Sequence, residues 1–513
     1  MKPSRLFKNV LTVGGWTLLS RILGMAREIM LYALIGVGPI LDAFIVAFRL
    51  PNMFRRFFAE GAFNTAFVPL YTKKLEAGQD ADDFASSAFS GLGLLLLVFT
   101  GLGLIFMPLL VLAFAGGFGG DERFDLSVDY GRVMFPYILL ISLAALLSGV
   151  LNAKGRFAMA AATPVFLNII IILALAAAWV FKASLITFLI WSIPLAGLVQ
   201  LGLVYWAAKN AGLRLRLSLP SLSPDMRKLA KVALPAALAN GVVQINLLVG
   251  QIVASFYPGA VSWLYGADRL YQLPLGVIGI AIGIVLLPEL SRHVQSGDHT
   301  AERQAFSQAS LISFALTFPA SVALILVPYP LVSALFEHGM TGPSDIAAIA
   351  LACSIYGLGL PAFILQKVLQ PLYFARSDTK TPFRYAVIAM ALNGALAVGL
   401  MPYLGWISPA IATTASSWLM VVLLYLGSRR FGAIAKLDQD ARQKMLKSAL
   451  AALLMGAILW MVQNSFGAAI DTSLLRIFYG VAFVFAGALL YTLLAQMIGA
   501  FKFSELKQSL RRG

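Results

Sequence analysis

Ten ionisable side chains lie within or beside strongly apolar segments of this sequence. A charged residue at the centre of a membrane span costs about 3 kcal/mol or more, so it normally faces a wet cavity or an ion-pair partner. The ten are Arg21, Arg27, Glu28, Asp42, Arg49, Arg55, Arg56, Glu60, Asp268 and Arg269. Six are arginines and four are carboxylates, so positive charge is in excess. Arginine stays protonated and can hold phosphate oxygens bidentately. The pattern therefore predicts a water-filled cavity suited to a diphosphate group.

Four of these residues are spaced to share one helix face. Asp42, Arg49, Arg56 and Glu60 follow one another at steps of seven, seven and four residues, which align on a continuous helix. Pro51 lies between them and is expected to kink or break that helix. A structural alternative stays open, in which these arginines form ion pairs that pin a broken helix or extend to the membrane interface. Ligand binding is the favoured interpretation of the group, whereas Lys367 and Arg476 are expected to have structural roles.

The surrounding composition indicates an integral membrane protein. The 513 residues are 60% hydrophobic and 12% charged, with a mean hydropathy of +0.84. Apolar residues form long runs, for example 91–117, 165–181 and 477–498. About 20 such residues span the hydrocarbon core as a helix. The first segment is expected to be a retained helix and not a cleaved signal peptide, because Arg21 and Arg27 interrupt it.

Hydropathy and punctuation together predict an all-α polytopic protein with about fourteen transmembrane helices. If the N-terminus is cytoplasmic, 28 of the 39 basic residues fall on the cytoplasmic side, while the opposite loops hold Arg123, Arg132 and Lys182. This asymmetry follows the positive-inside rule and predicts that both termini are cytoplasmic. The net charge of +16 is therefore explained by topology and does not indicate nucleic-acid binding.

The chain contains an internal repeat. Residues 38–50 can be laid over 258–270 at an offset of 220, and Tyr137 and Tyr356 match at an offset of 219. A nearly constant offset predicts two parallel six-helix lobes, at 1–215 and 216–435. Residues 436–513 then form two further helices and a basic cytoplasmic tail. Transporters with two such halves commonly bind substrate between them and rock for alternating access.

No pattern for enzyme chemistry stands out. The three histidines have no metal-ligand spacing, and there is no phosphate-binding loop with a Lys-Ser/Thr pair. The acidic loop around Asp121 and Asp125 is read as solvated. The single cysteine, Cys353, lies in an apolar run and is expected to be buried and inert. We predict no enzyme activity, no cofactor and no metal site.

Several motifs resemble the MurJ/MviN family. They are SRILGMARE at 20–28, RLPNMFRRFFAEGAF at 49–63, FPYILLISL at 135–143, ADRL at 267–270 and LPELS at 287–291. The resemblance covers nearly the whole chain. It implies two six-helix lobes plus two extra helices, within the multidrug/oligosaccharidyl-lipid/polysaccharide exporter superfamily. It also implies that lipid II, the undecaprenyl-diphosphate-linked peptidoglycan precursor, is moved from the cytoplasmic to the periplasmic leaflet of the inner membrane.

The same resemblance assigns roles to the charged residues. The family's cavity arginines match Arg21, Arg27, Arg55 and Arg269, and its functional carboxylates match Asp42 and Glu60. Glu28 stands where the family commonly has aspartate, Asp268 accompanies Arg269, and Arg49 and Arg56 are secondary cavity charges. The last two helices are implied to form a groove for the polyprenyl tail. A sodium site like that of some relatives is not expected, since the seventh, eleventh and twelfth expected spans lack Asp and Glu.

Other functions remain open from the residues alone. The protein could export another polyprenyl-linked oligosaccharide, act as a polyprenyl-diphosphate enzyme, or serve as a scaffold for cell-wall synthesis. The arginine surplus argues against export of cationic drugs. The favoured reading is a flippase that works as a monomer among membrane lipids, with the cell-wall synthesis machinery as a further partner and the membrane potential as an energy source.

Overall fold

The computed structural model describes residues 3–56, 62–216, 223–466 and 473–501. Throughout these ranges the regular structure is helical, with no strand. The chain divides into two compact units, Met1–Val261 and Ser262–Gly513. These units follow packing, and the lobe boundaries expected at 215 and 435 stay a prediction.

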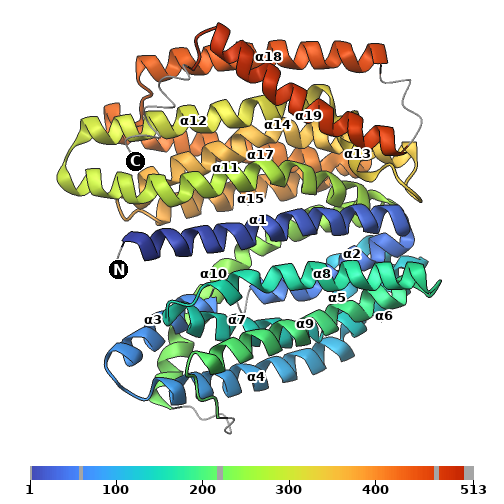
Figure 1. Cartoon of the computed structure of the whole chain (residues 1–513), viewed down its shortest axis with the longest axis vertical. Helices are drawn as coiled ribbons and strands as arrows, with labels where there is room; N and C mark the ends of the chain where they lie inside the picture. The colour runs from blue at the N-terminus through green and yellow to red at the C-terminus, as the bar shows by residue number, and fades with distance from the viewer. Residues whose placement is uncertain (1–2, 57–61, 217–222, 467–472, 502–513) are drawn as a thin grey trace. The chain divides into compact units, whose positions relative to one another are not determined.

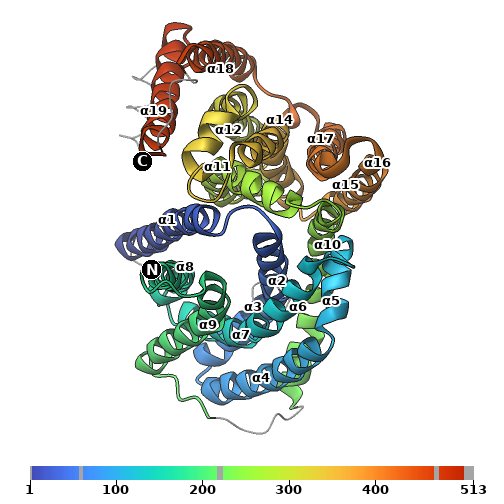
Figure 2. The same ribbon diagram turned by 90° about the vertical axis from the view of Figure 1, so that its right-hand side faces the viewer.

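The first unit contains ten α-helices and one 3₁₀ turn among its described residues (Figure 1). They are α1 Pro3–Leu34, α2 Pro39–Arg55, α3 Ala62–Glu76, α4 Ala81–Ile105, α5 Met107–Phe114, η2 Gly116–Phe118, α6 Glu122–Met134, α7 Tyr137–Ala153, α8 Ala158–Val180, α9 Leu185–Asn210 and α10 Pro224–Ser255. Within this unit α8 packs against both α1 and α9, α2 packs on α6, and α3 packs on α10 (Figure 2).

The second unit is likewise helical where it is described. Its elements are α11 Ala260–Ser296, which begins at the boundary, α12 His299–Leu326, α13 Pro328–Phe336, α14 Pro343–Phe374, α15 Lys380–Gly399, α16 Met401–Leu404, η3 Gly405–Ile407, α17 Ser408–Ser428, η4 Arg429–Ala435, α18 Gln439–Phe466 and α19 Ser473–Met497. Here α14 packs against α12 and α17, α18 lies on α12, and α19 lies on α13.

Local sequence explains where several of these helices begin. The side chains of Ser184, Ser223 and Asp298 each accept a hydrogen bond from a backbone N–H in the first turn of α9, α10 and α12. Such caps satisfy donors that the first helical turn leaves without partners. The prolines behave differently from expectation, because α2 continues past Pro51 to Arg55 and α14 continues through Pro361. The expected breaks at these prolines are therefore wrong.

Nine described helices are long and apolar enough to cross a membrane. A tenth candidate is the pair α6 and α7, which bend by 40° at a short break. Each of the fourteen helix centres expected from the sequence falls within a different helix, but the number of spans is not fixed at fourteen by this test. The charged helices α1 and α2 are not among the nine, since their charges lower the mean hydropathy. The chain is thus an all-helical, multi-pass membrane protein.

The order of helices repeats along the chain. Helix α10 begins 221 residues after α1, at 224 against 3, and α13 begins 221 residues after α5, at 328 against 107. The pair α6 and α7 is matched by the single helix α14, whose start lies 221 residues after that of α6, at 343 against 122. This order agrees with the offset of about 220 found in the sequence and supports the two parallel repeats.

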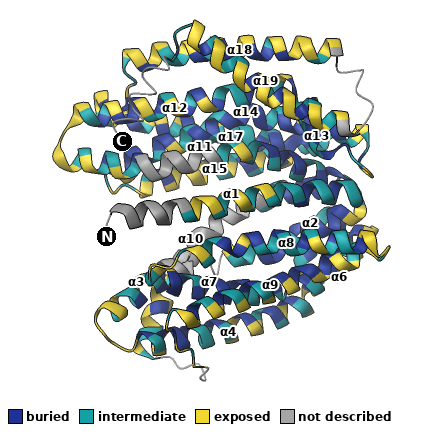
Figure 3. Cartoon of the chain, viewed as in Figure 1, coloured by how far each residue is buried: buried dark blue, intermediate teal, exposed yellow. Residues whose placement is uncertain are grey.

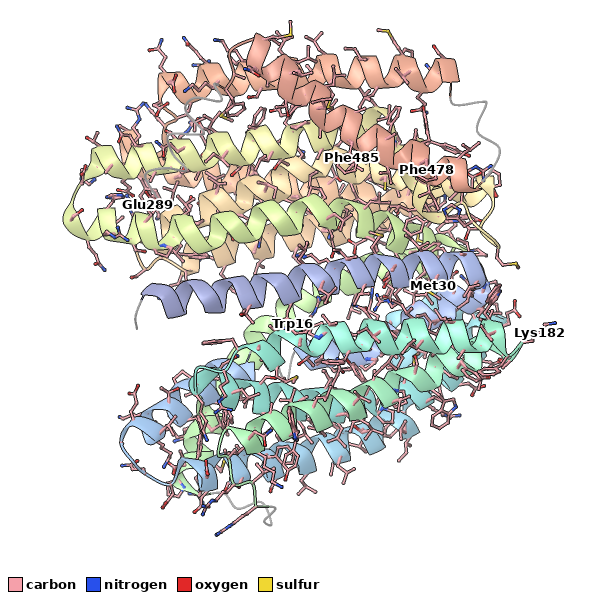
Figure 4. The ribbon with its side chains drawn as sticks, in the orientation of Figure 1. Trp16, Met30, Lys182, Glu289, Phe478 and Phe485 are labelled. Carbon is pink, nitrogen blue, oxygen red and sulfur yellow. The ribbon has the colours of Figure 1, made fainter. Side chains whose placement is uncertain are left out.

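Burial separates a central helix from a peripheral one in the second unit (Figure 3). In the apolar window of α14, 61% of residues are buried, against 17% in the window of α19. The exposed side of α19 carries large apolar residues, including Phe478 and Phe485, which are 64% and 70% exposed (Figure 4). An apolar exposed face on a membrane helix is solvated by lipid tails. Helix α14 is therefore core, and α19 is largely lipid-facing.

Close approach of α19 to α13 depends on Gly480. A Cβ atom added there would lie 2.1 Å from the Cβ of Ala334. We expect Gly480→Ala to destabilise the protein by about 1–3 kcal/mol, because the two helices must separate to admit the methyl group. The thermal midpoint of the detergent-purified protein measures this. Gly394→Ala on α15 is the matched control, because nothing lies within 4 Å of its added Cβ. Equal midpoints for the two variants would contradict the packing argument.

The turn between α14 and α15 gives a pH-dependent contribution. The Asp378 carboxylate accepts a hydrogen bond from the backbone N–H of Thr381 at 3.0 Å and pairs with Arg430. The Thr381 bonds and Arg430 lower the pKa of Asp378 from 3.8 to about 2. A lowered folded-state pKa means that the stabilisation is complete above about pH 4 and is lost as the pH falls toward 2. We expect Asp378→Asn to flatten the dependence of the thermal midpoint on pH between 5 and 3. A curve as steep as the parent's would exclude this contribution.

Candidate functional site

Arg27 and Glu28 form a buried ion pair near the C-terminal end of α1. Arg27 is 9% exposed and Glu28 is 1% exposed, and their side chains are in direct contact. A second bond runs from Arg27 Nη1 to Oδ1 of Asn168 on α8, at 3.0 Å. Asn168 in turn donates from Nδ2 to the carbonyl of Ser20, also at 3.0 Å. Asn168 therefore orients the guanidinium and joins α8 to two points on α1.

Asp42 belongs to a second buried network, at the start of α2. Its carboxylate is fully buried and accepts a hydrogen bond from the backbone N–H of Gly259 at 2.8 Å. Gly259 has φ +81°, a conformation that glycine adopts without the steric cost of a Cβ. Arg123 Nη1 lies 3.6 Å from the same carboxylate.

Arg123 is the centre of that network. Its side chain is 4% exposed, its Nη2 lies 2.6 Å from Asp121 and its guanidinium lies 4.3 Å from the centre of the Phe118 ring. It also donates to the carbonyl of Tyr257 at 3.5 Å. One guanidinium thus connects the start of α2, the start of α6 and the turn after α10. The sequence placed Arg123 and Asp121 in an outer loop, so their burial and pairing with Asp42 were missed.

Arg55 lies at the last position of α2 and lines a cavity of about 450 Å³ within the first unit. Asn52, one turn earlier, lines it too and donates to the carbonyl of Phe48 at 2.8 Å. Gln200 contributes from α9, where it accepts from the Tyr137 hydroxyl at 3.1 Å and donates to the carbonyl of Thr163 at 2.8 Å. The cavity therefore combines one guanidinium with neutral hydrogen-bonding groups.

The other predicted residues of the first unit are less deeply buried. Arg21 and Arg49 are partly exposed, and Arg56 is exposed at the end of α2. Glu60 lies outside the described residues. Five predicted arginines and two predicted carboxylates are therefore described in this unit, a formal excess of three positive charges. Positive excess in a low-dielectric environment favours an anionic ligand.

Asp268 and Arg269 lie side by side on α11 in the second unit. Arg269 Nη2 is 3.8 Å from Asp268, and the guanidinium lies 4.3 Å from the centre of the Tyr265 ring. Asp268 also accepts a hydrogen bond from Gln272, one turn later. Both charged residues are partly exposed. Arg269 is thus held by a carboxylate and an aromatic face, and its side chain keeps some accessible surface.

Arg476, predicted to be structural, contacts Glu337. Its Nη1 is 3.2 Å from the Glu337 carboxylate, and Glu337 is 6% exposed. This pair joins α19 to the end of α13. Among the described residues, no group of three His, Cys, Asp or Glu side chains could hold a metal ion.

We predict that Arg123 is required to keep Asp42 buried. Arg123→Leu should lower the free energy of unfolding by about 3 kcal/mol or more, because a buried carboxylate loses its counter-ion. Arg132→Leu, at an exposed position of the same helix, is the control and should lie within about 0.5 kcal/mol of the parent. In the double variant with Asp42→Asn, part of the loss should be recovered in thermal unfolding experiments. No recovery would show that the two residues are not coupled.

Comparison with known proteins places this site in a family. The family model described as "Lipid II flippase MurJ" matches residues 31–498. A protein of Rhizobium tropici named "Probable lipid II flippase MurJ" is 44% identical over 464 residues, which cover 89% of this chain and 87% of the relative. Another of the same name, from Rhizobium meliloti (strain 1021), is 41% identical over 520 residues and covers 99% of this chain and 97% of its own length.

A solved structure agrees with these relatives. The structure titled "Lipid II flippase MurJ, inward closed conformation" superposes with a TM-score of 0.80 at 26% identity. The match covers 94% of this chain and 98% of the other. The sequence relatives and the solved structure agree along nearly the whole chain. The chain therefore belongs to the lipid II flippase MurJ family.

Proposed function

We propose that the protein is a flippase that moves lipid II from the cytoplasmic to the periplasmic leaflet by alternating access. The observation that carries the proposal is the excess of arginine on α1 and α2, with Arg27 held by Glu28 and Asn168. A guanidinium fixed in this way is pre-organised for bidentate phosphate binding and loses little rotamer freedom when the ligand arrives. The names and the high coverage of the relatives support the same substrate.

The charged residues have distinct roles in this proposal. Arg21, Arg27, Arg55 and Arg269 bind the diphosphate, with Arg49 and Arg56 as secondary charges. Glu28 and Asp268 orient Arg27 and Arg269, since each contacts its neighbouring guanidinium. Asp42 acts through the Arg123 network, and Glu60 is a further functional carboxylate. Each charge-assisted hydrogen bond contributes about 1.5–3 kcal/mol, so a few arginines suffice to hold the headgroup.

The polyprenyl tail stays in lipid while the headgroup crosses. The exposed apolar face of α19 supports a path for that tail beside the second unit. We place the protein in the inner membrane with both termini cytoplasmic, as a monomer that works with the cell-wall synthesis machinery and performs no chemical step. Movement of the cavity charges through the membrane potential supplies energy, at about 2.3 kcal/mol per charge per 100 mV.

Complementation of a conditional lipid II flippase mutant tests the function. The parent should restore growth and the outward accessibility of lipid II, and Arg27→Ala should reduce flipping at least about tenfold, the cost of one lost charged hydrogen bond. Arg269→Ala should have a similar effect, and Arg132→Ala is the exposed control. Membrane levels are compared by immunoblot. Rescue by both cavity variants would assign these arginines to structure, and failure of the parent would favour another polyprenyl-diphosphate glycan.

A further inference from the structure

The Arg55 cavity has the size and wall chemistry of a binding site. Its volume of about 450 Å³ lies within the range of small-molecule sites, about 300–1,000 Å³. All of its lining residues belong to the first unit, on α1, α2, α7, α8 and α9 and in the turn before α8. The cavity can therefore be described without reference to the second unit.

One face of α7 forms a wall of this cavity. Ile141, Ala145, Ser148 and Asn152 all line it, and their spacing of four, three and four residues places them on one helical face. Within the part of the chain that the structure describes, the Ser148 and Asn152 side chains make no hydrogen bond to protein. Their polar atoms thus remain available to a ligand or water in the cavity.

The opposite groups divide into a satisfied set and a donor set. Gln200, Tyr137 and Thr163 bond to one another through the side chains of Gln200 and Tyr137. Asn52 uses its amide donor on Phe48, which leaves its carbonyl oxygen. Arg55 supplies the positive charge, and none of the lining residues is a carboxylate. This combination excludes a cation and fits an anion that carries a neutral polar group.

Apolar groups complete the cavity. Phe157, Ala160, Ala161, Pro164 and Leu167 line it from α8 and the turn that precedes it. A sugar ring presents hydroxyl groups at its edge and C–H groups on its faces. The hydroxyls suit Ser148 and the asparagines, the C–H faces suit the apolar wall, and an acetamido group pairs with an asparagine amide.

We propose that this cavity binds an acetamido-sugar phosphate, with the phosphate on Arg55 and the sugar against Ser148, Asn152 and Asn52. The inference rests on the proposed function, since it assigns the sugar next to the diphosphate to the interior of the first unit. Arg55 then holds the junction between sugar and phosphate, and the α7 face distinguishes the sugar from a bare phosphate.

Asn152→Asp tests this assignment, because it keeps the shape of the side chain and adds a negative charge near the phosphate. N-acetylglucosamine 1-phosphate is titrated by calorimetry into the full-length protein in a non-ionic detergent. It should bind at least tenfold more tightly than either inorganic phosphate or N-acetylglucosamine. Asn152→Asp should weaken that binding at least tenfold more than Asn152→Ala does.

The control variant is Asn210→Asp, which adds the same charge at an exposed asparagine that does not line the cavity. It should bind as the parent does, and equal thermal midpoints show that all three variants fold. If the sugar phosphate binds no better than inorganic phosphate, or if Asn152→Asp and Asn152→Ala are equal, the assignment is wrong.

Flipping by the parent is measured separately, so the two proposals fail independently. A parent that flips lipid II while Asn152→Asp binds the sugar phosphate normally refutes this site and leaves the function intact. A parent that binds the sugar phosphate through Asn152 without flipping lipid II refutes the function and supports the site.

Discussion

The cost of placing charge in a low-dielectric medium governs this structure. Each deeply buried charged group described here has a partner of opposite charge, as in Arg27 with Glu28, Arg123 with Asp42, and Arg376 with Glu302 at 2.6 Å. Such pairs do little for net stability compared with apolar packing, but breaking one leaves an uncompensated charge. The pairs therefore fix which helices must stay together, and they restrict how each unit can rearrange.

Neutral amides extend this control without adding charge. Asn168 and Gln200 lie inside otherwise apolar helices and each makes bonds to two other residues. Because unsatisfied amides in hydrocarbon are costly, both side chains specify one geometry for the helices around them. Positive charge can then be carried on rigid helices and not on loops, a condition for precise ligand binding.

The sequence predicts the helices well, because long apolar runs have few alternatives in a membrane. It also identifies the charged residues of α1, α2 and α11 as candidates, since charge in an apolar context is conspicuous. Their partners were not predictable. Asn168 lies 141 residues from Arg27 within a run that reads as apolar, and Arg123 reads as part of a solvated loop. Pro51 was overinterpreted, because neighbouring helices can hold a helix that contains proline. Whether the predicted residues act together on a ligand depends on the experiments above.

The ion pair between Glu337 and Arg476 has a consequence for biogenesis. The two residues are 139 positions apart in the chain. Because a ribosome makes the chain from the N-terminus, α13 leaves it long before α19 exists. During that interval the Glu337 carboxylate lacks this partner and must stay with interfacial water or a translocation factor. Final docking of α19, closely packed through Gly480, therefore completes the second unit after its central helices have been synthesised.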